Sequence, residues 1–499
     1  MELTGLTISS PQAKPAPLRI VSSEGRIAAL EPVAVSPSMP FVCAGFIDSH
    51  LHPLELGLQE IFVNLHGAGS LDHVLTGIRS WIGENPDSPL CLGFNLRPEL
   101  LKENRYPTCA ELDAVTGRTP TLVYRIDGHS AALNTPGLEL GLKHGKLPGV
   151  DLDQSGRHTG VVRGRAYEHA SRVFKHRLST DILRRALHKA SDKALARGVT
   201  TVAAMVGDRD LAEPDWQLLL GALADLDARA VPFCQTRDSG LAGKLGLSRV
   251  GGCILIDGSF GSHTAAVNQD YSDAPGNRGV LYFEDRELAA LLARAHQLGL
   301  QTAFHAIGDR AVEQLVRTHE QCDTCKGGNP LRHRIEHAEL LSPELVARIA
   351  ALGVVLGVQP AFESCWGGPQ GMYAARIGER WRKTNPYRSL LDAGVVLAGG
   401  SDAPITPIDP LAGIRSAVNH PNPDQRISGT QAFAMFTTAA AFSLGLETSC
   451  GRVEPGYDAD LAVLSADPRT GADCRVLATF RGGRRVFESA PQTTSQWLT

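Results

Sequence analysis

The sequence predicts an α/β protein built on a (β/α)8 (TIM) barrel, with a long insertion after strand 1 and a small β-sandwich domain formed from both termini. Three observations support this prediction. Apolar β-type runs alternate with helical stretches through the middle of the chain, eight such runs can be counted, and both ends of the chain consist of short, hairpin-like β segments. Repeated βα units indicate a parallel sheet, and eight of them are typical of a closed barrel.

The eight candidate strands are separated mostly by helix-type segments, such as residues 285–298 and 342–352. They cover residues 45–50, 199–205, 231–236, 253–256, 301–305, 333–337, 354–359 and 395–399. We therefore assign the barrel to residues 45–446. The gap after the first strand is too long for one crossover, so residues from about 55 to 180 are expected to form an insertion with its own strands, at 90–96 and 121–126, and helices.

The two ends of the chain are expected to form one composite domain. Residues 1–44 contain apolar runs separated by a turn cluster at 22–26. Residues 447–499 contain a strand-like run at 460–464 and two more runs that flank Gly482 and Gly483. This pattern predicts a small β-sandwich to which both termini contribute.

Composition excludes several classes of protein. The chain has 499 residues, 43% of them hydrophobic, and 49 Lys+Arg against 53 Asp+Glu, so there is no basic surplus for nucleic acid. No apolar stretch approaches the ~20 residues of a membrane helix. The ten cysteines are too few for a disulfide scaffold, and the first residues lack the features of a signal peptide. We expect a cytoplasmic enzyme that acts on a small molecule, without nucleic acid or membrane partners, and a homodimer is one possible assembly.

The sharpest local motif is a His-x-His pair at the end of the first predicted barrel strand. Alternate residues on a strand share a face, so His50 and His52 point together. Two imidazoles at the C-terminal mouth of a barrel provide half of a metal site. The alternative is that both histidines simply pack in a loop.

Other strand ends carry residues of the same chemistry. The fifth strand ends at His305, the sixth ends at His337, and the eighth is followed by Asp402. A single histidine at a strand end is more often structural than functional. Because a barrel brings all its strand ends to one mouth, the five residues together predict a metal site.

This constellation resembles the amidohydrolase superfamily, and within it the amidohydrolase-3 branch of N-substituted formamide deformylase-like metal-dependent hydrolases. The resemblance implies a barrel with a split β-sandwich, metal ligation by His50, His52, His305 and His337, and a double role for Asp402 as ligand and proton shuttle. The motifs that carry it lie at residues 44–53, 106–134, 198–201, 257–265, 305–312, 334–337, 401–410 and 451–461.

One position departs from the family pattern. The family usually has a lysine four residues before the Asp-Gly of strand four, and this lysine can be carboxylated to bridge two metals. Here the position is Cys253, ahead of Asp257 and Gly258. Either Cys253 ligates metal, or the site is mononuclear and Cys253 is a small buried thiol. We expect a divalent ion, zinc before others, with one or two ions per chain and one favoured.

Candidate substrate contacts come from the insertion and one barrel loop. The resemblance suggests that the insertion covers the barrel mouth. His129 would then either contact the substrate or hold the insertion in place through a hydrogen bond. Arg125, Asp127 and Arg237 are further candidates, although structural or solvated salt links are an alternative for each.

Three functions remain open at this stage. The first is a metal-dependent hydrolase of a C–N bond (amide, N-acyl or N-formyl), in which water is activated by metal and Asp402 is the general base and acid. The second is a cyclic-amide hydrolase or deaminase on the same scaffold. In such deaminases a glutamate often occupies the position that is Gly308 here, which counts against a nucleobase substrate. The third is a catalytically silent barrel that binds a ligand.

Overall fold

The computed structural model describes residues 1–126, 128, 130–142, 147–207, 211 and 213–490. The chain divides into two compact units, one of Met1–Pro53 with Ala190–Thr499 and the other of Leu54–Lys189. The first unit contains the barrel sheet and a sheet built from the chain ends, and the second contains a separate sheet. Among the described residues, no helix is long and apolar enough to cross a membrane.

The barrel is a sheet of eight parallel strands, which confirms the predicted fold class. In chain order they are β5 (Phe46–Leu51), β12 (Val199–Val206), β13 (Arg229–Cys234), β14 (Arg249–Leu255), β15 (Gln301–Ala306), β16 (Arg334–His337), β17 (Val355–Val358) and β18 (Leu397–Gly399). The ring closes where the amide of Asp402 donates to the carbonyl of His50 (2.8 Å) and the amide of His52 donates to that of Ala403 (2.9 Å). The segment after the last strand therefore lies beside the end of the first.

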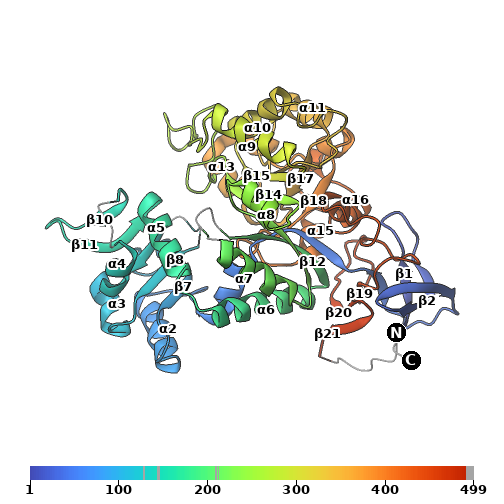
Figure 1. The fold of residues 1–499 in the computed structure, drawn as a ribbon, viewed down its shortest axis with the longest axis horizontal. Helices are drawn as coiled ribbons and strands as arrows, with labels where there is room; N and C mark the ends of the chain where they lie inside the picture. The colour runs from blue at the N-terminus through green and yellow to red at the C-terminus, as the bar shows by residue number, and fades with distance from the viewer. Residues whose placement is uncertain (127, 129, 143–146, 208–210, 212, 491–499) are drawn as a thin grey trace. The chain divides into compact units, whose positions relative to one another are not determined.

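The burial of both faces of these strands explains why their sequences are nearly continuous apolar runs. Every residue of β5, β12 and β15 is buried, as expected for parallel strands covered on both faces. Figure 1 shows α9, α10 and α11 grouped beside β15 and β17. Helices of the barrel unit include α7 (Glu213–Ala224), α9 (Asp285–Gln297), α10 (Asp309–Gln321), α11 (Pro343–Leu352), α15 (Pro410–Val418), α16 (Gly429–Met435) and α17 (Thr438–Ser443).

Shorter helices occupy the loops that follow several strands. They are α8 (Ser239–Lys244), α12 (Ala361–Trp366), α13 (Met372–Ile377), α14 (Tyr387–Asp392) and the 3-10 turns η2 (Gly378–Lys383) and η3 (Pro423–Gln425). Four of them, α12, α13, η2 and α14, lie in the connection between β17 and β18. This connection therefore carries more structure than a simple crossover helix.

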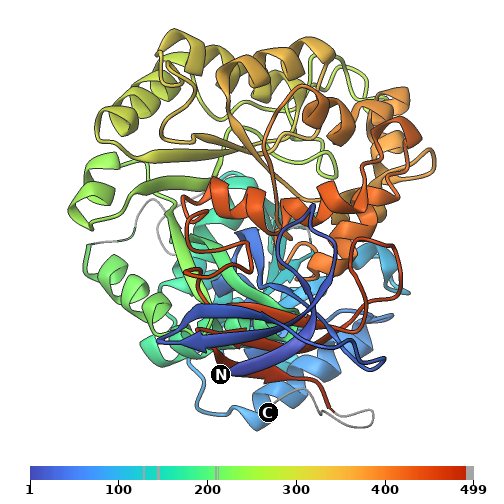
Figure 2. The same ribbon diagram turned by 90° about the vertical axis from the view of Figure 1, so that its right-hand side faces the viewer.

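Strands from both ends of the chain share one seven-stranded sheet. Its order is β21-β20-β19-β4-β1-β2-β3, with β1 (Glu2–Ile8), β2 (Ala16–Ser23), β3 (Arg26–Pro32), β4 (Phe41–Ala44), β19 (Leu461–Leu464), β20 (Val476–Arg481) and β21 (Arg484–Glu488). Figure 2 shows the N-terminal strands in blue beside the C-terminal strands in red. Leu3, Val42, Leu461 and Phe480 are buried in its core.

The second unit has a six-stranded mixed sheet of order β10-β11-β9-β8-β7-β6. Its strands are β6 (Val63–Asn64), β7 (Cys91–Leu96), β8 (Thr121–Arg125), β9 (Ser130–Leu133), β10 (Val150–Leu152) and β11 (His158–Arg163). Its helices are α2 (Leu71–Glu84), η1 (Pro98–Leu100), α3 (Cys109–Thr116), α4 (Thr135–Gly141) and α5 (Gly164–Lys175), and α1 (Pro53–Ile61) and α6 (Thr180–Ala196) span its two boundaries in the sequence.

The closure of the barrel predicts the effect of a methyl group at Gly400. A Cβ there would lie 2.6 Å from the amide nitrogen of His50 and 2.9 Å from its Cβ. Gly400→Ala should therefore destabilise the protein by ~1–3 kcal/mol, the usual range for overpacking. Gly221→Ala is the control, because Gly221 is exposed in α7 with nothing within 4 Å, and this change should be neutral or stabilising. Equal midpoints of chemical denaturation for the two variants would refute this view of the ring closure.

Candidate metal centre

Three of the predicted ligands meet at the point where the barrel closes. His50 and His52 leave the end of β5 on one face, and Asp402 follows β18. Asp402 Oδ1 lies 3.3 Å from His50 Nε2 and 3.2 Å from His52 Nε2. The nearest ligand atoms of this trio all lie within 4.8 Å of one another, close enough to share one ion.

A second trio shares His50 with the first. It consists of His50, Cys253 and His337, again with all ligand atoms within 4.8 Å. His305 borders it, since its Nδ1 lies 3.8 Å from Cys253 Sγ and its ring centroid lies 4.4 Å from that of His337. All six residues that the sequence nominated as ligands thus lie together at the ends of β5, β14, β15, β16 and β18.

The tautomers of three histidines are set by hydrogen bonds on the side away from the centre. His50 donates from Nδ1 to Glu336 Oε2 (2.8 Å), and His337 donates from Nδ1 to Gln359 Oε1 (2.7 Å). His305 donates from Nε2 to the carbonyl of Gly258 (3.2 Å), which leaves Nδ1 toward Cys253. Each ring therefore presents an unprotonated nitrogen to the same place, as metal-ligating histidines do.

Unpartnered atoms test whether an ion fits. His50 Nε2, His337 Nε2 and Asp402 Oδ1 are buried and complete no hydrogen bond. Buried polar atoms normally have partners, and an ion is one explanation for atoms that have none. Neutral imidazoles with a carboxylate and a thiol form a donor set suited to zinc and similar ions. The residues present fit a divalent metal.

The charges around the centre also favour a cation. Burial raises the pKa of Asp402, but contacts with His50 and His52 outweigh it and hold that pKa well below its usual range. Burial likewise raises the pKa of Cys253, and the surrounding histidines, His305 first, reverse this effect and lower it strongly. Burial lowers the pKa of His52, yet Asp402 and Cys253 raise it to about 10. Protons and metal therefore compete for these groups, so acid should release the ion.

Glu336 is the supporting residue that the sequence did not single out. Arg334 donates to it from Nε (2.7 Å) and Nη2 (2.9 Å), and Nη2 also donates to the carbonyl of Ser49 (2.9 Å). Burial raises the pKa of Glu336, but Arg334 and the bond from His50 lower it to about 2. Glu336 therefore remains an ionised acceptor that orients His50.

Two further buried acids hold the loops near the ligands. Asp257 accepts backbone hydrogen bonds from Ala266 (2.7 Å), Ile307 (2.9 Å) and Gly308 (2.8 Å). Asp48 accepts from the amide of Ser401 (2.9 Å), next to Asp402. Asp257 was visible in the sequence only as a family motif. Its hydrogen bonds assign it a structural role beside His305.

Two of the candidate substrate contacts, Arg125 and Arg237, form ion pairs in the structure. Arg125 belongs to the second unit, where it forms an ion pair with Glu99 (3.3 Å). His129 and Asp127 lie outside the described residues. Arg237 donates to Glu287 (2.7 Å), and its guanidinium lies 4.1 Å from the ring centroid of Phe283. The structure therefore places Arg237 in a salt bridge.

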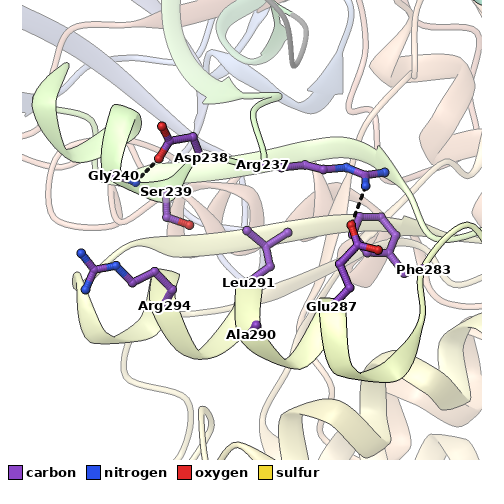
Figure 3. Close-up of a pocket in the computed structure, with 9 residues that line it drawn as sticks. All are labelled: Arg237, Asp238, Ser239, Gly240, Phe283, Glu287, Ala290, Leu291 and Arg294. Atoms are coloured by element: carbon purple, nitrogen blue, oxygen red, sulfur yellow. Dashed lines mark hydrogen bonds and ion pairs between the residues drawn. The ribbon is translucent and has the colours of Figure 1, made fainter.

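Arg237 borders a hollow of about 400 Å³ between α8 and α9. Figure 3 shows its ion pair with Glu287 at one end of this groove and Arg294 at the other. The remaining lining residues are Asp238, Ser239, Gly240, Phe283, Ala290 and Leu291. None of the six clustered ligands lines this groove, so it is a feature separate from the candidate metal centre.

The hydrogen bond between His50 and Glu336 predicts the behaviour of Glu336→Gln. This change removes the negative charge that favours the Nδ1–H tautomer, so metal affinity should fall about 10–100-fold. The affinity can be measured by competition with a chromophoric chelator. Glu320→Gln, which removes only a surface ion pair with Arg348 (2.7 Å), is the matched control. A folded Glu336→Gln protein that binds metal as the control does would contradict this role.

Comparisons with known proteins agree with this geometry. The sequence profile of the amidohydrolase family matches residues 41–487. Protein LONG AFTER FAR-RED 3 of Arabidopsis thaliana is 30% identical over 487 residues, covering 89% of this chain and 82% of that protein. N-substituted formamide deformylase of Arthrobacter pascens is 26% identical over 493 residues (90% and 88%). An uncharacterized metal-dependent hydrolase from Pyrococcus horikoshii OT3 superimposes with a TM-score of 0.78 at 26% identity, covering 97% of this chain and 99% of that one. This chain belongs to the amidohydrolase family.

Proposed function

We propose that this protein is a metal-dependent hydrolase that cleaves the C–N bond of an amide, an N-acyl or an N-formyl compound. The observation that carries the proposal is the position of Asp402, whose unpartnered Oδ1 lies between His50 and His52. A site that only binds a ligand does not require an ionised carboxylate between two histidines. The name of the Arthrobacter relative makes N-formyl amines the first substrates to test.

The residues of this chain have distinct tasks in the proposed reaction. His50, His52, His305 and His337 would hold the ion together with Asp402, and Cys253 is the candidate additional ligand. A divalent ion bound there supplies Lewis acidity, which polarises a carbonyl and makes water nucleophilic near neutral pH. Asp402 is ionised at the start because its pKa is low. It accepts the proton of the attacking water and then delivers it to the leaving nitrogen.

Gly308 favours amide hydrolysis over nucleobase deamination. A Cβ at Gly308 would lie 2.0 Å from the carbonyl oxygen of Ala266, so no side chain fits at this position. The glutamate with which related deaminases protonate a ring nitrogen therefore has no place here. Turnover of any N-acyl compound by the metal-loaded protein would also exclude a silent binding barrel.

Asp402→Asn tests the proton transfer. The change keeps the shape of the side chain but removes the base, so kcat should fall at least ~100-fold, the lower end for general acid–base catalysis. Hydrolysis of N-formyl and N-acyl amines by the metal-loaded protein provides the measurement. The fold should be intact by circular dichroism, and a fully active Asn variant would rule out the proposed base.

Cys253→Ser tests the number and nature of the ions. Cysteine forms no carbamate and offers one sulfur, so we expect about one tightly held ion per chain, with zinc favoured by imidazole and thiolate donors. If Cys253 is a ligand, the Ser variant should bind zinc more weakly. Elemental analysis of the purified protein and chelator competition measure both quantities. Two stoichiometric ions in the wild type would show that another residue bridges them.

A further inference from the structure

A second group of buried polar residues lies beside the candidate metal centre. We call it the acidic cluster; it consists of Glu339, Glu363, Tyr373 and Tyr387. Glu339 follows β16, Glu363 is in α12, Tyr373 in α13 and Tyr387 in α14. Each residue is at most 2% exposed. The cluster thus draws on the structured connection between β17 and β18 as well as on β16.

Two members of the acidic cluster have a buried oxygen without a hydrogen-bond partner, Glu363 Oε2 and the hydroxyl of Tyr387. The other two members, Glu339 and Tyr373, interact with one another through their side chains. Buried oxygens without a partner are few in a native structure, and an unseen water or ion is one reason for them. The two free oxygens indicate a site that something fills.

Asn385 and its neighbour Thr384 tie the carboxylate of Glu363 to the backbone at Glu339. The amide of Asn385 donates to the carbonyl of Glu339 (2.6 Å), and its Nδ2 donates to Glu363 Oε1 (2.9 Å). Thr384 Oγ1 donates to the same Oε1 (2.7 Å). Glu363 therefore has one saturated oxygen and one free oxygen, and it is close enough to Glu339 to interact with it electrostatically.

The cluster lacks a cation of its own. Among the described side chains, the one ion-pair partner of either carboxylate is His420, whose Nε2 lies 3.7 Å from Glu363 Oε1. A buried carboxylate without compensation is costly, and burial is the main reason why the pKa of Glu363 is raised to about 7. A positively charged ligand beside Glu363 would remove this cost.

The geometry favours an organic cation over a bare metal ion. Within the described part of the chain, the His, Cys, Asp and Glu groups that lie close enough to share one ion include neither Glu339 nor Glu363. Aromatic rings stand next to the cluster, since Trp366 lies 6.5 Å from Tyr373 and 4.6 Å from Phe362 between ring centroids. Spaced oxygens and aromatic faces are the surroundings that an alkylammonium group prefers.

The cluster is connected to the metal ligands. Glu339 is two residues beyond His337, and the ring of His337 stacks on Phe362 (6.2 Å), the neighbour of Glu363. We propose that the acidic cluster binds the ammonium group of the substrate, so that the substrate is an amide carrying a positively charged alkylamine. That the bound compound is an amide substrate rests on the proposed hydrolase function. The binding of a cation by the acidic cluster does not depend on that function.

Calorimetry of the metal-loaded protein with 1,4-diaminobutane tests the cation site directly. The wild type should bind the diamine, and Glu363→Gln should weaken binding at least about tenfold, because a charge-assisted hydrogen bond is lost. Tyr373→Phe, which removes the hydroxyl that interacts with Glu339 and keeps the ring, should weaken it less. Glu287→Gln, in the groove of Figure 3, is the matched control and should bind as the wild type does. Absence of binding, or equal binding by all four proteins, would overturn the inference.

A pair of substrates separates this inference from the proposed function. N-acetyl-1,4-diaminobutane carries the cation, and N-pentylacetamide is its uncharged counterpart. The wild type should prefer the cation in kcat/KM by at least about tenfold, and Glu363→Gln should abolish that preference. Equal hydrolysis of both amides would refute the cation site and leave the hydrolase intact. Diamine binding that depends on Glu363, without hydrolysis of any amide, would support the site and count against the function.

Discussion

The hydrogen bond from His50 to Glu336 is the contact on which the candidate metal centre depends. His50 belongs to both trios of ligand atoms, so the direction of its free nitrogen decides whether either trio can hold an ion. Glu336 secures that direction only while it is ionised, and Arg334 keeps it so. Since Arg334 also donates to the backbone of Ser49, the same group ties β16 to β5 through the barrel interior. Stability and chemistry therefore share one buried charge pair.

Much of this arrangement could be predicted from the sequence, for a physical reason. Parallel strands covered on both faces are nearly continuous apolar runs, and all eight were recognisable. Because a barrel gathers its strand ends, residues as distant in sequence as His50 and Asp402 could be expected to meet. The boundary of β14 was less accurate: the strand begins at Arg249, not 253, because Gly251 and Gly252, both at positive φ, weaken the apolar pattern.

Other features could not be predicted because they depend on side-chain packing between distant elements. Glu336, which orients His50, differs from an ordinary strand residue only in being an acid on a buried strand. Gln359 and Asp257 likewise acquire their roles from partners on neighbouring strands and loops. The acidic cluster joins residues from β16 to α14 and has no motif. A buried acid within an apolar run is the one signal that would have drawn attention to such positions.

Cys253 bears on two properties of the candidate centre, the number of ions and their identity. Its sulfur lies with His50 and His337 in one trio, whereas His52 and Asp402 complete the other around the same His50. A carbamate in this position would span two ions, but a thiolate is shorter and approaches one. We therefore expect a single ion that draws on both trios, with the acidic cluster and not a second metal providing further recognition of substrate.

Anomalous diffraction at the zinc absorption edge, from crystals of the purified protein, tests most directly whether one ion binds at His50. We expect one strong peak per chain within bonding distance of His50 Nε2, with Asp402 among the ligands. If Cys253 ligates, its sulfur should lie ~2.3 Å from the peak. A metal site remote from His50, or two equal peaks bridged by a residue other than those named here, would contradict this expectation.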